Sequence, residues 1–393
     1  MKLFRLPGLW ALSLLCSSSS GAPLDAGHPQ AGITYFNNNT VFQSPPNYTV
    51  PGTLYARTVQ LADLSLLATW ENYSPEPPPV YFPIYRSTDY GKTWSELSRV
   101  QDTSGNNYGM RYQPFLYVLP QDWSVWKAGT VFLAGSSIPT DLSSTDIQLY
   151  ASTDSGVSWQ FVSSIAKGGE AVPDNGLTPV WEPFLMLYND MLVCYYSDQR
   201  DPAHGQKLVH QTTTDGKSWS DVVDDVAYSN YADRPGMPVV ARMGKSSSAT
   251  YIMTYEYGGG PVDGVLPVNY TFPVFYKISS DPAAFGAVEG QPIVTNDESR
   301  TVPVSSPYVI YDEKEDMIIV SCGTLSDVFV NHAGGDVGAW ESRTTGERVS
   351  YTRGLRIIYD QSWERALLLA GGGTLPPSEG NKVTVGVVDV QGW

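Results

Sequence analysis

Short runs of apolar and aromatic residues, separated by polar turns, recur along nearly the whole chain. Residues 58–70 and 317–323 alternate between apolar and polar positions, as half-buried strands do. Further strand-like runs cover 80–86, 146–151 and 207–211. The sequence contains no long amphipathic helical pattern. We therefore predict an all-β protein built from many short strands.

The pattern differs at the N-terminus, where a short basic segment precedes an apolar run at 6–16 and small residues follow. This is the layout of a secretory signal peptide, which we assign to residues 1–21. The run is too short to cross a bilayer, and no later segment approaches about 18 uninterrupted apolar residues. We expect a secreted, extracellular protein whose single folded domain covers 32–393.

A turn sequence recurs at even intervals. Residues 87–94 and 152–159 both fit S-x-D-x-G-x-x-W, a shortened copy covers 213–219, and a decayed copy begins at Ser279. The aromatic ends of these copies are 65, 60 and 66 residues apart, a period that divides the chain after the leader into about six units. In each copy Asp can accept hydrogen bonds from turn amides, Gly supplies a positive φ, and the aromatic ring fills the hairpin end. The spacing predicts a six-bladed β-propeller of four-stranded blades, with both chain ends meeting in one blade.

Composition narrows the possible partners. The 29 Pro and 36 Gly residues suit many tight connections, and the aromatic content of 12% suits strands. A net charge of −16 with a pI near 4.6 argues against nucleic acid and membrane partners, because polyanions need a basic face. The same charge favours a neutral ligand over a strongly anionic one. We expect a monomer.

Cysteine and histidine offer little chemistry. Cys194 and Cys322 lie beyond the leader in apolar runs, and the sequence leaves open whether they are buried thiols or one disulfide. Metal-ligand spacings such as CxxC and HExxH are absent from the sequence, so we predict no metal site and no organic cofactor. Asn-x-Ser/Thr sequons suit a glycosylated secreted protein; they begin at Asn38, Asn47, Asn72 and Asn269.

Two acidic residues stand at the ends of aromatic, apolar strands. Glu182 lies in VWEPFL and Glu256 lies in YEYGG. Burial of an acid is unfavourable and therefore often marks a functional site. Glycosidic cleavage uses such a pair, because one carboxyl group protonates the leaving oxygen and another attacks carbon or activates water. Taken alone, these contexts leave a structural role open for each residue.

Together with the repeated turns, the two contexts resemble those of glycoside hydrolase family 93, and the similarity covers nearly the whole chain after the leader. The turns are of the Asp-box type, which lies away from the active site in sialidase-like propellers. The resemblance implies a six-bladed, exo-acting arabinanase that releases arabinobiose from linear α-1,5-arabinan with retention. It also implies that Glu182 is the acid/base and Glu256 the nucleophile.

Further substrate contacts are expected where the strand starts of a propeller converge on its central funnel. The polar and aromatic candidates at such positions are Arg57, Arg111, Gln113, Arg234 and Tyr308. Tryptophans are candidate stacking platforms, although a propeller tryptophan is more often part of the core; the candidates are Trp70, Trp181 and Trp340.

Two alternative functions remain open. An exo-sialidase shares the fold and the Asp boxes, but Arg57 stands in YARTV, without the Ile-Pro that follows the early arginine of sialidases. A non-catalytic carbohydrate-binding propeller would use the boxes only as scaffold. Such a protein has no need of two acids at aromatic strand ends, so we favour the hydrolase.

Overall fold

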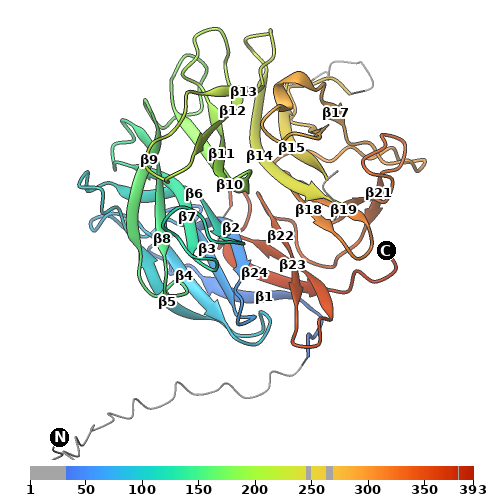
Figure 1. Cartoon of the computed structure of the whole chain (residues 1–393), viewed down its shortest axis with the longest axis horizontal. Coiled ribbons are helices and arrows are strands. Elements are labelled where there is room, and N and C mark those ends of the chain that lie inside the picture. Colours follow the sequence, from blue (N-terminus) through green and yellow to red (C-terminus); the bar gives the residue numbers. More distant parts are fainter. Residues whose placement is uncertain (1–31, 245–248, 263–268, 379) are drawn as a thin grey trace, which may run out of the picture. The chain divides into compact units, whose positions relative to one another are not determined.

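The computed structural model describes residues 32–244, 249–262, 269–378 and 380–393. The described residues form six antiparallel sheets of four strands each. The sheets stand around a central axis, and each innermost strand contacts the innermost strands of the two neighbouring blades (Figure 1). This arrangement confirms the predicted all-β, six-bladed propeller. The predicted signal peptide lies outside the described residues and stays a prediction.

Each of the first three blades runs in chain order from its innermost to its outermost strand. The first blade contains β2 (Thr53–Gln60), β3 (Leu66–Asn72), β4 (Phe82–Ser87) and β5 (Ser95–Val100). The second contains β6 (Gly109–Val118), β7 (Val131–Ile138), β8 (Thr145–Ser152) and β9 (Gln160–Gly168). The third contains β10 (Val180–Tyr188), β11 (Met191–Asp198), β12 (Lys207–Thr213) and β13 (Val223–Val226).

The fourth and fifth blades follow the same order, and the sixth takes its outermost strand from the N-terminus. The fourth contains β14 (Arg234–Met243), β15 (Thr250–Gly258), β16 (Val274–Ser279) and β17 (Gln291–Pro292). The fifth contains β18 (Tyr308–Asp312), β19 (Met317–Ser321), β20 (Val328–Asn331) and β21 (Glu341–Arg343). The sixth contains β22 (Gly354–Tyr359), β23 (Arg365–Gly371), β24 (Lys382–Val388) and β1 (Phe36–Gln43).

The ring is closed by pairing between the first and last strands. β1 runs antiparallel to β24, with Phe36 opposite Val387 and Gln43 opposite Lys382. The prediction that the chain ends meet in one blade is therefore confirmed. A single turn of 3-10 helix, η1 (Phe285–Ala287), is the one helix among the described residues. No helix in that part of the chain has the length and apolarity to span a bilayer.

The Asp boxes stabilise the hairpins between the third and fourth strands of the blades. Asp89 accepts hydrogen bonds from the hydroxyl of Ser87 and from the N–H and hydroxyl of Thr93. Gly91 has a φ of 93°, and its carbonyl accepts the indole N–H of Trp94. The boxes around Asp154 and Asp215 repeat the Asp contacts, and none of these residues reaches the pocket described below.

The fifth blade carries a further copy of the box that the sequence pattern did not reveal. Asn331, at the end of β20, accepts the N–H of Ala333 and of Gly335, and Gly335 has a φ of 90°. Asn331 thus takes the place of the serine of a box, binding the glycine N–H four residues on, as Ser87 does. The segment does not fit S-x-D-x-G, because Asn331 replaces the serine and Ala333 replaces the aspartate.

Every innermost strand has a residue of positive φ in its N-terminal half or two residues before its start. These residues are Tyr55 (55°), Gln113 (56°), Glu182 (61°), Met237 (59°), Ser306 (42°) and Thr352 (55°). In the first four blades the strand register shifts at this residue, as it does in a β-bulge. A bulge bends the strand and turns its side chains and N–H groups in new directions. These six residues of positive φ, four of them in bulges, form a ring at one end of the central channel, which we call the ring of bulges.

The structure shows the state of the two cysteines and the exposure of the sequon asparagines. Cys194 and Cys322 are both buried and both free, so the alternative of a disulfide is wrong. The side chain of Asn72 is buried in β3, so this sequon is not accessible for glycosylation in the folded protein. The asparagines of the other sequons, Asn38, Asn47 and Asn269, are exposed.

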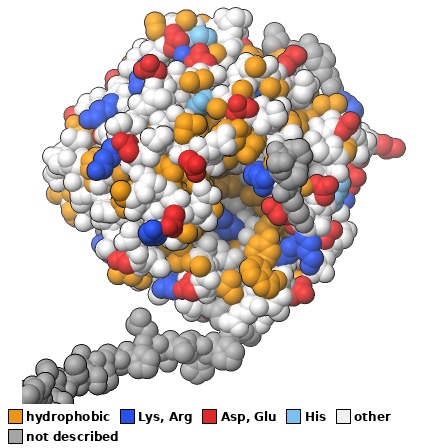
Figure 2. All heavy atoms as spheres, viewed as in Figure 1, with side chains coloured by type: hydrophobic (Ala, Val, Ile, Leu, Met, Phe, Trp, Pro, Cys, Tyr) orange, Lys and Arg blue, Asp and Glu red, His pale blue; other side chains and the backbone are white. Residues whose placement is uncertain are grey.

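Acidic and basic side chains are interspersed over the face shown in Figure 2. Near the centre of this face the surface is hollowed, and hydrophobic and basic side chains border the hollow (Figure 2). The hollow lies near the axis around which the blades are arranged.

Candidate active site

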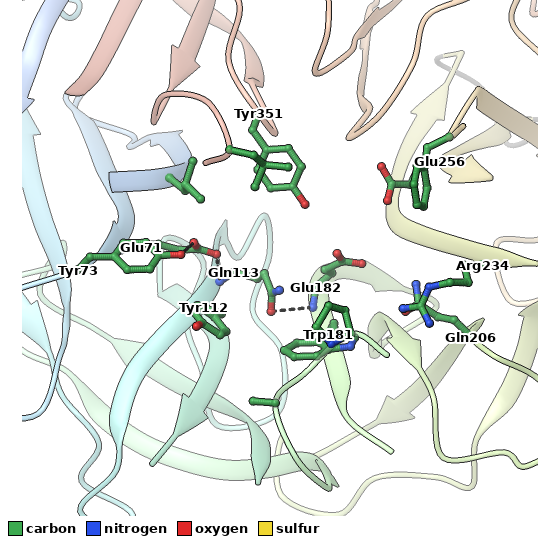
Figure 3. Close-up of a pocket in the computed structure, with 15 residues that line it drawn as sticks. Glu71, Tyr73, Tyr112, Gln113, Trp181, Glu182, Gln206, Arg234, Glu256 and Tyr351 are labelled. Carbon is green, nitrogen blue, oxygen red and sulfur yellow. Dashed lines mark hydrogen bonds between the residues drawn. The ribbon is translucent and has the colours of Figure 1, made fainter. Parts of the chain in front are cut away.

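A pocket of about 430 Å³ lies over the ring of bulges, lined by side chains from five of the six blades. Its walls are aromatic and apolar, with contributions from Tyr73, Tyr112, Trp181, Phe272 and Tyr351. Glutamates project into it from three blades (Figure 3). A pocket of this kind, mostly apolar with a few fixed polar groups, is the usual form of a small-molecule site.

Glu182 occupies the bulge of β10 itself. One carboxylate oxygen, Oε2, accepts the hydroxyl of Ser197 at 2.6 Å and the N–H of Met237 at 2.8 Å. The N–H of Glu182 donates to Oε1 of Gln113 at 3.3 Å (Figure 3). Burial raises the pKa of Glu182, while the hydrogen bonds from Ser197 and Met237 and the charge of Arg234 oppose the rise.

Glu256 lies near the end of β15 and faces the same space. Its Oε2 accepts the N–H of Ser306 at 2.8 Å and the hydroxyl of Ser305 at 3.2 Å. A Cβ at position 236 would lie 3.3 Å from Oε1 of Glu256, so Gly236 leaves room for the carboxylate. Burial, followed by the charge of Glu182, raises the pKa of Glu256 to about 7. The two carboxyl groups are therefore close enough to be coupled.

Arg234 supplies positive charge beside this pair. Its guanidinium donates to three neutral amide oxygens, those of Asn175, Gln199 and Gln206. It forms no ion pair with any carboxylate among the described residues, so its charge is not neutralised locally. Arg234 opposes the rise in the pKa of both Glu182 and Glu256.

Glu71, at the end of β3, is a third carboxylate in the pocket wall. Its Oε1 accepts the N–H of Gln113 at 2.9 Å, and its Oε2 accepts the hydroxyl of Tyr73 at 2.8 Å (Figure 3). Burial raises the pKa of Glu71 to about 7. Because the side chain of Gln113 accepts the N–H of Glu182, Gln113 links Glu71 to the coupled pair.

The ring of bulges explains why the acids meet here. In three places the N–H of a ring residue donates to a carboxylate of the preceding blade. The pairs are Gln113 with Glu71, Met237 with Glu182, and Ser306 with Glu256. Such N–H groups favour the charged form of an acid and fix its orientation.

The arrangement is suited to acid–base chemistry on a neutral ligand. Glu182 and Glu256 form a coupled pair in a pocket of low polarity, where one carboxyl can carry a proton while the other is ionised. Tyr351 points into the middle of the pocket that both acids face (Figure 3). No cluster of three His, Cys, Asp or Glu side chains in the described part of the chain could hold a metal ion.

Known structures decide the family of this chain. A GH93 α-L-arabinofuranosidase of Fusarium graminearum, solved with arabinobiose, is 51% identical and has a TM-score of 0.84; the match covers 91% of this chain and 98% of that one. The chain belongs to glycoside hydrolase family 93. It is therefore a glycoside hydrolase, as the two glutamate contexts and the Asp-box spacing predicted.

Another structure supports the same membership. An α-L-arabinanase of Penicillium chrysogenum, also solved with arabinobiose, is 51% identical with a TM-score of 0.85, over 92% of this hydrolase and 99% of that chain. No protein-family model matches the sequence. A xyloglucanase of Acetivibrio thermocellus is 26% identical over 155 residues, which are 38% of this chain but only 17% of the xyloglucanase.

Of the predicted site residues, five line the pocket of this family 93 hydrolase. These are Gln113, Trp181, Glu182, Arg234 and Glu256. The bulge at Glu182 interrupts the usual alternation of side chains, so its neighbour Trp181 also reaches the pocket. The indole N–H of Trp181 donates to Gln199, which also binds Arg234.

Trp70 and Trp340, which the sequence offered as candidate stacking platforms, do not line the pocket. Both are fully buried. Trp70 packs between Phe42 and Tyr85, with ring centroids 5.2 and 4.8 Å away, and Trp340 packs against an aromatic ring of the fourth blade. Trp70 precedes Glu71 on a regular strand, so its side chain points away from the pocket that Glu71 faces.

Arg57, Arg111 and Tyr308, also predicted as substrate contacts, do not line this pocket. Arg57 is buried, and its guanidinium lies 4.1 Å from the ring centroid of Tyr55 and 4.9 Å from that of Tyr308. Tyr308 instead lines a second cavity along the innermost strands. Arg111 forms an ion pair with Glu76 at 2.7 Å.

Several polar or aromatic residues that line the pocket were not predicted from the sequence. Among them are Glu71, Tyr73, Tyr112, Gln206 and Tyr351. A signal existed only for Glu71, since an aromatic residue precedes the glutamate at positions 71, 182 and 256 alike. Tyr351 lies between strands, where no periodic pattern identifies it.

Proposed function

We propose that this hydrolase cleaves linear α-1,5-arabinan from a chain end and releases arabinobiose. The observation that carries the proposal is the coupled pair Glu182 and Glu256 in a single pocket, in a chain about half identical to two enzymes solved with arabinobiose. A neutral sugar chain also suits a protein with a net charge of −16.

In the proposed mechanism Glu182 donates its proton to the glycosidic oxygen while Glu256 attacks the anomeric carbon. The bond to the leaving sugar breaks, and an ester joins Glu256 to the arabinosyl residue. Glu182, now ionised, takes a proton from water, whose oxygen displaces Glu256 and restores both groups. Such a double displacement retains the anomeric configuration and operates with carboxyl groups about 5–5.5 Å apart.

The charge state of the pair fits one proton shared between two acids. The pKa of Glu256 is raised to about 7, partly by the charge of Glu182. The pKa of Glu182 is raised as well, so the two groups titrate as a pair that holds a proton more tightly than a free glutamate does. Catalysis requires the proton on Glu182 when the substrate is bound. We propose that the bound glycosidic oxygen, as an acceptor beside Glu182, draws the proton there.

Incubation with linear arabinan, a sialoside and xyloglucan, followed by sugar analysis, tests the substrate. Arabinobiose as the main product supports the proposal, whereas release of sialic acid, or no hydrolysis of arabinan, overturns it. Proton NMR during turnover gives the configuration of the first product, and inversion overturns the double displacement.

The roles of the two acids are tested with substrates of different leaving groups. Glu182→Ala should lose activity on arabinan but keep much of it on an aryl glycoside, whose leaving group needs no proton, and azide should accelerate it. Glu256→Gln should be inactive on both substrates. The opposite pattern would exchange the two roles.

The proposed substrate is a polymer, which agrees with secretion through the predicted signal peptide at 1–21. N-terminal sequencing of the protein recovered from the medium tests this. A mature chain that begins near residue 22 supports secretion, and an intact N-terminus retained in the cells contradicts it.

A further inference from the structure

We propose that Glu71 is a substrate-binding residue, whose carboxylate accepts hydrogen bonds from hydroxyl groups of the sugar held beside Glu182. This inference rests on the proposed function, because it assigns a role within the same pocket. It gives the pocket three acids with separate tasks: two for bond cleavage and one for recognition of the sugar.

The geometry of Glu71 is that of a fixed acceptor. Each carboxylate oxygen already accepts one hydrogen bond, from the N–H of Gln113 at 2.9 Å and from the hydroxyl of Tyr73 at 2.8 Å. When ionised, above its pKa of about 7, the carboxylate has about four acceptor sites, so each oxygen retains the capacity to accept another donor. Glu71 lines the pocket, and neighbouring hydroxyl groups of a sugar ring are donors of the right kind.

The fold itself gains little from this carboxylate. Glu71 is buried and forms no ion pair with any Lys, Arg or His of the described residues. Burial without a paired charge is unfavourable for an acid. A glutamine would fill the same space and still bind Gln113 and Tyr73 without this penalty, so the acid is explained by what it binds.

The connection to Glu182 places the bound sugar at the reacting groups. Gln113 donates its N–H to Glu71 and accepts the N–H of Glu182 through its side chain. A single residue thus fixes both acids, and a sugar that contacts Glu71 lies next to the coupled pair (Figure 3). Binding at Glu71 should therefore orient the ring for attack, which affects the KM more than the chemical step.

The test compares Glu71→Gln with the wild-type hydrolase on linear arabinan and on an aryl arabinobioside. The amide keeps the size of the side chain and can still bind Gln113 and Tyr73, but it loses the charged acceptor. We expect the KM to rise about ten- to hundred-fold on both substrates, as for loss of a hydrogen bond to a charged group, while kcat falls less.

Glu347→Gln is the matched control. Glu347 is also buried and accepts the N–H of Asn38 and the hydroxyl of Thr384, but it lies where the first and last strands pair and not in the pocket. Its KM and kcat should match those of the wild type. An equal loss of activity in both variants would indicate a structural effect of buried glutamates and would overturn the proposal.

A complementary measurement uses the wild-type protein and does not depend on the folding of a variant. Aryl arabinobiosides that lack one hydroxyl group of the cleaved residue should have a raised KM for at least one position. Glu71→Gln should show no further rise with that same substrate, because the lost hydroxyl and the lost carboxylate belong to one interaction.

Other outcomes contradict the inference. An unchanged KM in Glu71→Gln, or no deoxygenated substrate with a raised KM, overturns it. A loss confined to arabinan, with the aryl substrate unaffected, would make Glu71 a proton donor and also overturns it. If the wild-type protein does not hydrolyse arabinan at all, the proposed function fails first, and this result is distinct from the others.

Discussion

Replacing Glu256 by glutamine should stabilise the protein at alkaline pH while it abolishes turnover. The folded-state pKa of Glu256 is about 7, above its ordinary value of 4.5, because the side chain is buried beside Glu182. Since the folded state binds this proton more tightly than the unfolded chain, the wild-type protein loses stability as the pH rises from about 4.5 to about 7. Glutamine resembles the protonated acid, can still accept from Ser306 and Ser305, and avoids this loss.

The size of the effect follows from the pKa. A rise from 4.5 to about 7 corresponds to about 3 kcal/mol at pH 8, and nothing at pH 4. With an unfolding entropy of about 2.1 cal/mol/K per residue over about 360 residues, this shifts the midpoint of thermal unfolding by about 4 °C.

Thermal unfolding followed by circular dichroism at pH 4 and pH 8 measures the shift. The exposed Glu313, replaced by glutamine, is the control and should leave the midpoint unchanged at both pH values. The reasoning fails if Glu256→Gln changes the midpoint equally at pH 4 and pH 8, or lowers it at pH 8.

Three further variants test the scaffold and the corrected site. Asp154→Ala removes the acceptor of an Asp-box turn and should reduce the free energy of unfolding by about 1–3 kcal/mol, measured in urea, with an unchanged KM. Trp70→Phe should destabilise the first blade by about 1–3 kcal/mol without changing the KM, whereas a raised KM would restore its role as a sugar platform. Asp312→Asn breaks a fully buried pair with Arg365, which joins the fifth and sixth blades, and should cost about 3–5 kcal/mol in the same urea measurement.

The fold could be predicted because its signals are local. The Asp box needs only an acceptor, a glycine of positive φ and an aromatic plug within eight residues, and these occur together in 87–94 and 152–159. Even spacing of the copies then indicates the blade length. The copy around Asn331 could not be predicted from the pattern. The amide of Asn331 accepts the N–H of the glycine four residues on, as the serine of the other boxes does, but it does not match the serine in the sequence.

The site could be predicted only in part, because it depends on direction as well as position. Trp70 and Trp181 each precede a pocket glutamate, yet Trp181 lines the pocket and Trp70 lies in the core. The difference is the bulge at Glu182, which the residue types around it do not predict. Glu71 directly follows Trp70 and was not predicted as a site residue, although an aromatic residue precedes it as in the other two acids.

The ring of bulges also changes how the strain at Glu182 is understood. A positive φ in a residue other than glycine is unfavourable by about 1–2 kcal/mol and often marks a functional site. Here all six blades contain such a residue, so the strain belongs to the fold and would exist without catalysis. What distinguishes the active half of the ring is the side chain that each bulge N–H meets: three glutamates in the first, third and fourth blades, and an amide, Gln113, in the second. The propeller therefore supplies oriented N–H donors at four positions of the ring, and the positions of the acids decide where on that ring the chemistry occurs.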